Sequence, residues 1–134
     1  MHWKNQVETE EEAIRAEVSR LPDTDRQAFY EQFNQRLKDP DTYAALAWSL
    51  PVGLHHFYLG NSLRALMDIG IFLSCIAMIL SGIFNGRVVS MMLGILLILG
   101  VTIAEFYSLF RSQVIVQDHN NKLMRKILVT CTRR

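Results

Sequence analysis

The chain has 134 residues, half of them hydrophobic, and a formal net charge of +1. Charge is dense over residues 1–41, sparse over residues 42–110, and mostly basic again from residue 111 onward. A soluble domain mixes polar and apolar residues throughout, so this separation into blocks favours a membrane as the solvent of the middle block. The acidic balance of the front argues against nucleic acid and against anionic lipid as partners of that region.

Residues 1–41 are expected to form a soluble acidic region with two amphipathic helices. The first is predicted over Gln6–Arg20 and ends at Pro22. Its apolar stripe consists of Val7, Ile14, Val18 and Leu21. Thr24–Gln27 has the form of a capping box for the second helix. The stripe of that helix consists of Phe29, Phe33 and Leu37, widened by Tyr30. Two such helices cannot form a stable core alone, so we expect them to pack on the tail, on the membrane or on another subunit.

The next apolar segment, Tyr43–Leu54, is short for a membrane span, which needs about 20 residues. Pro51 removes a backbone donor and Gly53 loosens the turn that follows. Continuing through residues 55–60 gives an uncharged length that could cross. The sequence therefore leaves two structures open, a short kinked or re-entrant helix and a third span.

Two later segments, Leu63–Phe84 and Val88–Phe110, are each long enough to span a bilayer. A hydrocarbon core of about 30 Å requires roughly 20 residues at about 1.5 Å per residue. The residues between them, Asn85, Gly86 and Arg87, form a strong turn signal. We therefore predict an all-α fold with a membrane helical hairpin, and the polar flanks are too few to bury such a hairpin in water.

The tail over residues 111–134 is basic, whereas the predicted turn carries only Arg87. The positive-inside rule therefore places the turn outside and the C-terminus in the cytoplasm. A helix over Lys122–Arg134 would align Leu123, Ile127 and Leu128 on one side. This tail could dock on the acidic front or lie on anionic headgroups, and the sequence leaves both open. The polar first 40 residues do not resemble a cleavable signal peptide.

The segment AALAWSLPVGLHHFYLGNS, which begins at Ala44, resembles the signature of the two-transmembrane-helix domain family. The matching residues are Ala45, Leu46, Gly53, His55, Phe57, Tyr58, Leu59 and Gly60. His56 stands where that family usually has arginine, and Glu105 where it usually has aspartate. The resemblance covers residues 43–110 and implies an integral membrane protein that carries variable soluble parts and has no known reaction. From this resemblance and the small size we expect a bacterial inner membrane location.

Polar side chains are predicted to gather at one end of the hairpin. Asp68 lies 17 residues before Asn85, and Glu105 lies 18 residues after Arg87, so the two carboxylates should reach a similar depth. Arg64 is one helical turn before Asp68 and can pair with it. The predicted intramembrane polar cluster is therefore His55, His56, Arg64, Asp68 and Glu105.

This cluster could lock the first apolar segment onto the hairpin, or it could form a proton or ion path. A divalent metal is a further possibility that we do not expect. Adjacent histidines rarely share one metal, and no H-x-x-x-H spacing is present. The sequence also shows no nucleophile elbow, phosphate loop or dinucleotide fingerprint, so we expect no catalytic residues and no cofactor.

Small residues four apart predict close helix packing in the hairpin. They are Gly70, Ser74, Ala77 and Ser81 in the first segment, with Ser90 and Gly94 in the second. They could serve packing within the hairpin or self-association. The sequence thus predicts a non-enzymatic assembly, accessory or scaffolding protein, in a homo-oligomer or a larger membrane complex. The alternative is a small oligomeric ion or proton channel, or a transporter.

Overall fold

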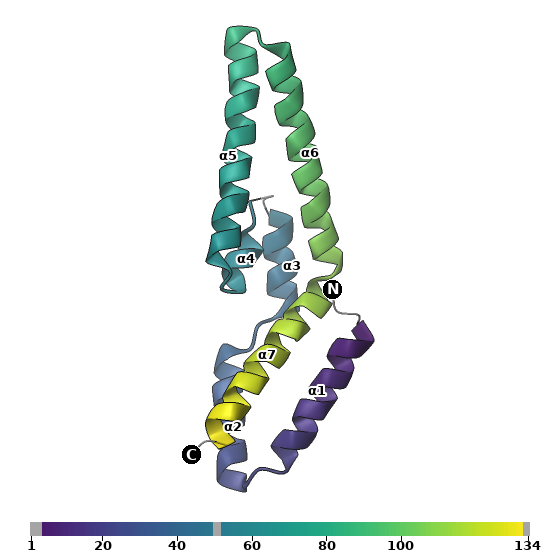
Figure 1. The fold of residues 1–134 in the computed structure, drawn as a ribbon, viewed down its shortest axis with the longest axis vertical. Coiled ribbons are helices and arrows are strands. Elements are labelled where there is room, and N and C mark those ends of the chain that lie inside the picture. Colours follow the sequence, from purple (N-terminus) through teal and green to yellow (C-terminus); the bar gives the residue numbers. More distant parts are fainter. Residues whose placement is uncertain (1–3, 50–51, 133–134) are drawn as a thin grey trace. The chain divides into compact units, whose positions relative to one another are not determined.

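The computed structural model describes residues 4–49 and 52–132, and in these ranges every regular element is an α-helix. The all-α prediction is therefore confirmed. The chain divides into two compact units. We call residues 1–40 with 113–134 the terminal unit, and residues 41–112 the hairpin unit (Figure 1). The predicted acidic front and basic tail thus belong to one unit.

The terminal unit contains helices α1 (Lys4–Ser19), α2 (Asp23–Arg36) and α7 (Ser112–Thr132). Apolar side chains from all three helices form its core. The buried members are Ile14, Val18, Phe29, Met124, Ile127, Leu128 and Cys131. Leu21, Phe33 and Leu123 pack against them. The apolar stripes of α1 and α2 are therefore buried against α7. This is the first of the three alternatives that the sequence left open, packing on the tail.

Hydrogen bonds also hold α7 against the front of the chain. Those to α1 are Gln117 Nε2 to Glu11 Oε2 (2.6 Å), Asn121 Nδ2 to the Val7 carbonyl (2.8 Å) and Arg125 Nε to Glu10 Oε1 (2.7 Å). Asn120 accepts from the Lys38 amide (3.1 Å) and donates to the Lys38 carbonyl (2.9 Å). The bond from Gln117 is the main cause that lowers the pKa of Glu11. These bonds fix the register of α7.

The start of α2 differs from the predicted capping box. The helix begins at Asp23, its N-cap position is Pro22, and no side chain caps it. The Pro22 carbonyl accepts the first helical bond, from the Arg26 amide at 2.9 Å. Thr24 therefore lies inside the first turn, because the fixed φ of Pro22 already directs the chain into the helix.

The hairpin unit contains α3 (Pro40–Ser49), α4 (Leu54–Tyr58), α5 (Ser62–Asn85) and α6 (Val88–Phe110). Among the described residues, α5 and α6 are the two helices long and apolar enough to cross a membrane. Their bounds agree closely with the two predicted segments. The first apolar segment instead forms the short helix α3, a turn and α4, while Pro51 lies outside the described residues.

Helices α5 and α6 lie side by side and are joined by a turn at which Gly86 has a φ of 65° (Figure 1). Small groups set their approach. A Cβ built on Gly82 would lie 2.5 Å from the Met91 Cβ, and one on Gly94 would lie 2.9 Å from the Cys75 carbonyl oxygen. Ser90 donates a hydrogen bond across the interface to the Met78 carbonyl, at 3.0 Å.

The predicted row of small residues on α5 lies away from this interface. A Cβ on Gly70 would have no heavy atom within 4 Å, and Ser74 and Ala77 are exposed. Ser81 is half-buried and accepts from Asn85 in its own helix. Spacing of four residues identifies a face of a helix but not the direction in which that face points.

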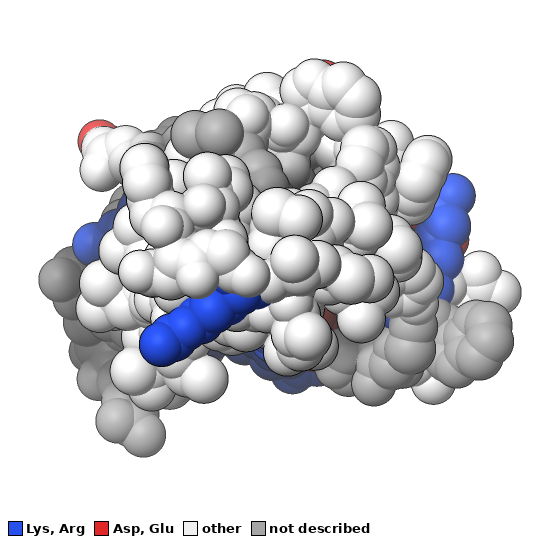
Figure 2. Space-filling view, turned by 90° about the horizontal axis from the view of Figure 1, so that it is seen from above, with Lys and Arg blue, Asp and Glu red and all other residues white. Residues whose placement is uncertain are grey.

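The outer surfaces of α5 and α6 are apolar. Only 11% of the most hydrophobic window of each helix is buried, whereas the core helix of a soluble protein would be largely covered. On the face seen from above, uncharged residues cover most of the surface, and a Lys or Arg side chain extends across it (Figure 2). Such a surface is stable in hydrocarbon and costly in water.

Candidate functional site

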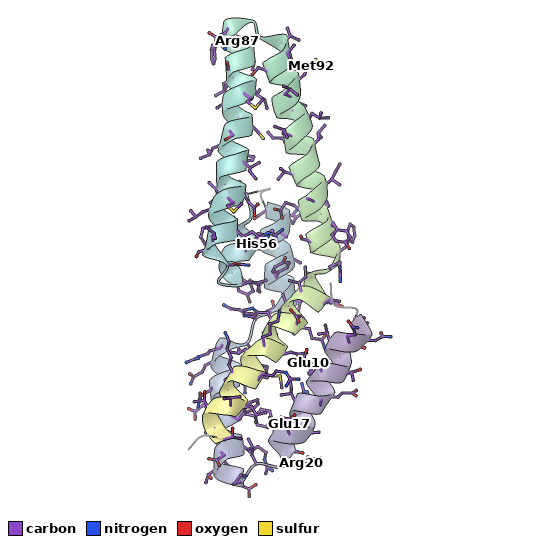
Figure 3. All side chains as sticks on the ribbon, viewed as in Figure 1. Glu10, Glu17, Arg20, His56, Arg87 and Met92 are labelled. Atoms are coloured by element: carbon purple, nitrogen blue, oxygen red, sulfur yellow. The ribbon has the colours of Figure 1, made fainter. Side chains whose placement is uncertain are left out.

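The predicted polar cluster assembles at the end of the hairpin away from the turn. His55 and His56 come from α4, Arg64 and Asp68 from α5, and Glu105 from α6. Figure 3 shows His56 at this end and Arg87 at the opposite end, beside the turn. The equal depth of the two carboxylates, inferred from their distances to the turn, agrees with this arrangement because each contacts one of the adjacent histidines.

His55 is the most enclosed member of the cluster. His55 is 0% exposed, and Glu105 is 8% exposed. The Nε2 atom of His55 lies 3.3 Å from Oε2 of Glu105. Neither ring nitrogen of His55 has a hydrogen-bond partner among the described residues, and neither has that oxygen of Glu105. Two facing polar groups are therefore buried at short range without a directed hydrogen bond.

His56 faces the second carboxylate. Its Nε2 lies 3.5 Å from Oδ2 of Asp68. The rings of His55 and His56 lie with centroids 4.1 Å apart and planes tilted by 44°. Neighbouring side chains on a regular helix diverge by about 100°, so this close approach is a property of the short helix α4 and its contacts.

Gly53 is required for the position of Asp68. It has a φ of 69°, and a Cβ at this residue would lie 2.6 Å from Oδ2 and 2.8 Å from Cβ of Asp68. The backbone that leads into α4 thus packs directly on the Asp68 side chain. A side chain at residue 53 would both strain the backbone and displace the carboxylate from His56.

Arg64 differs in position from the sequence-based expectation. It is exposed, and the carboxylate of Asp68 contacts His56 instead of forming the predicted pair within α5. Its positive charge still acts on the cluster. Burial, together with the nearby charges of His56 and Arg64, lowers the pKa of His55 to about 4. Burial likewise lowers the pKa of His56. Both imidazoles are therefore neutral near pH 7.

Tyr43 from α3 completes the wall of the cluster, a role that sequence reasoning did not assign to it. Tyr43 is 1% exposed, and its ring contacts the His55 ring edge-on at a centroid distance of 4.9 Å. Burial, together with the charge of Glu105, raises the pKa of Tyr43 to about 12. A tyrosine in the first turn of an apolar helix, twelve residues before a histidine, gives no sequence signal of this contact.

The residues of the resembled motif have separate positions in the hairpin unit. Gly53 and His55 belong to the cluster, whereas Phe57 is 42% exposed. Tyr58 and Leu59 are half-buried at the end of α4, and Gly60 follows with a φ of 76°. The motif therefore builds the α4 turn and supplies one buried polar ligand group to the cluster.

A small cavity of about 40 Å³ adjoins the cluster. It is lined by Ala47, Trp48, Thr102, Glu105, Phe106 and Leu109. A single water needs about 10–15 Å³ by this kind of measure, so the cavity holds a few water molecules at most. It gives Glu105 room for a solvent neighbour, and it is too small for a lipid chain.

Three side chains could hold a metal ion together. One ligand atom from each of His55, His56 and Glu105 lies within 4.8 Å of the other two. Two imidazoles and a carboxylate are the donor set of several zinc sites. The fold and the cluster thus define an all-helical protein with two helices apolar enough to cross a membrane and a buried His/carboxylate cluster. Comparisons with protein-family models, with curated proteins and with solved structures gave no match.

Proposed function

We propose that this chain is a small integral membrane protein with a non-enzymatic assembly or scaffolding role, in which α5 and α6 span the bilayer. The observation that carries the proposal is the contrast between the apolar surface of these helices and the hydrogen-bonded, charged surface of the terminal unit. Helices α5 and α6 anchor the chain in the bilayer, and the terminal unit lies in water, where a partner can bind it. The resemblance to the two-transmembrane-helix domain family agrees with this proposal.

The order of the helices along the chain supports two membrane crossings. Helix α7 shares a core with α1 and α2, so the front and the tail must lie on the same side of the membrane. The chain between them then crosses an even number of times. Helix α3 has 10 residues. At about 1.5 Å per residue it reaches roughly half the hydrocarbon thickness. We therefore propose that the α3–α4 segment does not span.

The basic tail orients this arrangement. Lys122, Arg125 and Lys126 lie in α7 and favour the cytoplasmic side. The proposal therefore places both chain ends in the cytoplasm, with a bacterial inner membrane as the host, and the α5–α6 turn outside.

Cysteine accessibility in intact cells tests this topology. Single cysteines are introduced as Asn5→Cys, Asn85→Cys and Thr132→Cys in a background with Cys75→Ala and Cys131→Ala. Asn85 is used rather than Gly86, whose positive φ does not suit a side chain. A membrane-impermeant thiol reagent is expected to label only Cys at position 85. Labelling at one terminal position but not the other contradicts the two-crossing topology.

The self-assembly part of the proposal rests on the outward face of α5. A Cβ at Gly70 would meet no heavy atom of the described residues within 4 Å, and small residues on such a face let helices approach closely. Subunit counting in lipid bilayers is expected to give more than one copy for the wild type, and fewer for Gly70→Leu. Gly100→Leu is the matched control, since Gly100 also has no neighbour within 4 Å. If the wild type is a monomer in bilayers, self-assembly is refuted, and the scaffolding role then requires a complex with other proteins.

A proton or ion path is the second candidate, and the contacts of His55 with Glu105 and of His56 with Asp68 favour it. Against it, no charged residue or histidine occurs from residue 69 to 86 or from 88 to 104. That leaves about 25 Å of each helix without a titratable relay group. Proteoliposomes are expected to show no proton flux; flux that Glu105→Gln and Asp68→Asn abolish would establish the channel in place of the scaffold.

A further inference from the structure

We propose that His55, His56 and Glu105 form a binding site for a divalent transition-metal ion of the zinc class. The site joins α4 to α6, and all three residues belong to the hairpin unit. The inference goes beyond the scaffolding role and does not depend on it.

The ligand separation fits a tetrahedral ion. Zinc binds imidazole nitrogen and carboxylate oxygen at about 2.0–2.2 Å, so two ligand atoms of one tetrahedron lie about 3.4 Å apart. His55 Nε2 and Glu105 Oε2 are 3.3 Å apart. All three donor atoms fall within 4.8 Å of one another, so movements of the ligand atoms by about 1 Å bring them to tetrahedral spacing.

The buried polar atoms supply an independent reason. Buried side-chain nitrogens and oxygens nearly always have a hydrogen-bond partner, because a lost bond costs free energy. Both ring nitrogens of His55 lack one among the described residues, although this residue is 0% exposed. Oε2 of Glu105 lacks one as well. A metal ion between these atoms satisfies a nitrogen and an oxygen that the described residues leave without hydrogen bonds.

The surroundings resemble those of metal-binding histidines. A ligand histidine commonly has its second ring nitrogen held by a carboxylate, which orients the ring and raises its basicity. Asp68 Oδ2 lies 3.5 Å from Nε2 of His56 and can serve in this way, leaving Nδ1 for the ion. Gly53 holds that carboxylate in position. The cavity beside Glu105 leaves a position for water as the fourth ligand.

The donor set selects the class of ion. Imidazole suits zinc, copper, iron and nickel, whereas magnesium and calcium prefer oxygen ligands. From the sequence alone, the adjacent histidines and the missing H-x-x-x-H spacing argue against a metal. The structure changes both premises, since the two rings face one another at 4.1 Å and the third ligand comes from a residue 49 positions further on (105 − 56).

Zinc binding to the wild-type chain tests the proposal directly. The full-length protein, carrying an affinity tag without histidines, is stripped with a chelator in detergent and dialysed against buffered Zn²⁺. We expect one saturable Zn²⁺ per chain that a thousandfold excess of Mg²⁺ does not displace. Absence of saturable binding overturns the proposal, and this outcome involves no variant that could misfold.

Variants then locate the ion. His55→Gln, His56→Gln and Glu105→Gln are each expected to weaken Zn²⁺ binding tenfold or more. His119→Gln is the matched control, because His119 lies in the terminal unit, and it should change binding less than twofold. Wild-type affinity in all three cluster variants, or an equal loss in His119→Gln, overturns the assignment.

Two further variants exclude unfolding as the cause of weaker metal binding. One exchanges a ligand, and the other removes a nearby positive charge. Glu105→His keeps a ligand at this position, so Co²⁺ should still bind with a changed visible spectrum. Arg64→Gln removes a positive charge that acts on both histidines, so Zn²⁺ binding should tighten severalfold. An unchanged Co²⁺ spectrum in Glu105→His, or weaker binding in Arg64→Gln, contradicts the site. Subunit counting is a separate readout, so failure of the scaffold and failure of the metal site are distinguishable.

Discussion

The two units of this chain have opposite interiors and exteriors. In the terminal unit Phe29 is 0% exposed, and the surface carries ion pairs such as that of Arg125 with Glu10. In the hairpin unit Phe84 is 80% exposed, while a histidine and a glutamate are buried. Each arrangement suits one solvent. Water drives apolar groups inward, whereas hydrocarbon gives no such drive and forces polar groups to face each other.

The two units also differ in how their helices approach. Large side chains fill the terminal core, so its stability depends on burial area. The hairpin uses Gly82 and Gly94, at which the backbones themselves come close. Removing side-chain atoms from the core should therefore destabilise the terminal unit. Adding side-chain atoms at the helix interface should destabilise the hairpin unit.

The largest expected effect comes from Phe29→Ala. Removing a fully buried phenylalanine should destabilise the terminal unit by about 3–5 kcal/mol. Hydrogen exchange should then become fast in α1, α2 and α7 and stay slow in α5 and α6. The same substitution in the other unit, Phe84→Ala, should change exchange by less than about 0.5 kcal/mol. Equal loss of protection in both units would show that they fold as one.

The second comparison adds one methyl group to α5. Gly82→Ala places a Cβ 2.5 Å from Met91 Cβ and 2.8 Å from its backbone nitrogen, neither of which can move without the helix. We expect a loss of about 1–3 kcal/mol in reversible unfolding in mixed micelles. Gly70→Ala meets no neighbour within 4 Å and should be neutral or gain up to about 1 kcal/mol from helix propensity. A similar loss in both variants would contradict the α5–α6 interface.

A buried amide distinguishes the polar contacts of the units. Asn121 is 1% exposed and donates to the Val7 carbonyl, so Asn121→Ala should cost the terminal unit about 1–2 kcal/mol. Asn85 is exposed and bonds only within its own helix, so Asn85→Ala should stay within about 0.5 kcal/mol. Denaturant midpoints followed by hydrogen exchange of α7 measure the first effect, and a cost that is equal for both variants would refute it.

The smallest effect is a pH dependence confined to the terminal unit. Burial, together with Lys38, Lys122 and Lys126, lowers the pKa of His119 below 6.5, and Asp118 opposes this shift. Below pH 6.5 the unfolded chain therefore binds the proton more readily, so the stability from neutral His119 is complete above pH 6.5 and falls as pH decreases.

Hydrogen exchange in α7, corrected for its intrinsic pH dependence, should show this decline between pH 7.5 and 5.5. His119→Gln should flatten the profile. The lowered pKa of Glu11 acts only below pH 4.5 and does not interfere in this window. A wild-type slope that persists in His119→Gln would assign the effect to another group.

Several elements of the fold follow directly from the sequence. The apolar lengths of the two long helices and the Asn85–Arg87 turn predict α5 and α6 within a residue or two. The depth argument also predicts that Glu105 and Asp68 reach the histidines, because a hairpin converts distance from the turn into height. Both inferences use local composition, the turn residues and the regular rise of a helix.

The remaining contacts depend on helix rotation and on long-range packing, which no local pattern encodes. The row at Gly70 has the right spacing but points away from α6, whereas Gly82 faces Met91. Asp68 contacts His56 rather than Arg64, and the backbone at Gly53 packs closely on its side chain. The sequence does not decide where α7 docks, because a basic amphipathic helix fits acidic side chains and anionic headgroups equally well.

The shared core of α1, α2 and α7 has a consequence for biosynthesis. A ribosome makes α1 and α2 first, then both long apolar helices, and only afterwards the residues that cover Ile14, Val18 and Phe29. The N-terminal stripe therefore stays uncovered while α5 and α6 are being made. A product interrupted after α6 would keep that stripe bare, and cellular proteases could recognise it as unfinished.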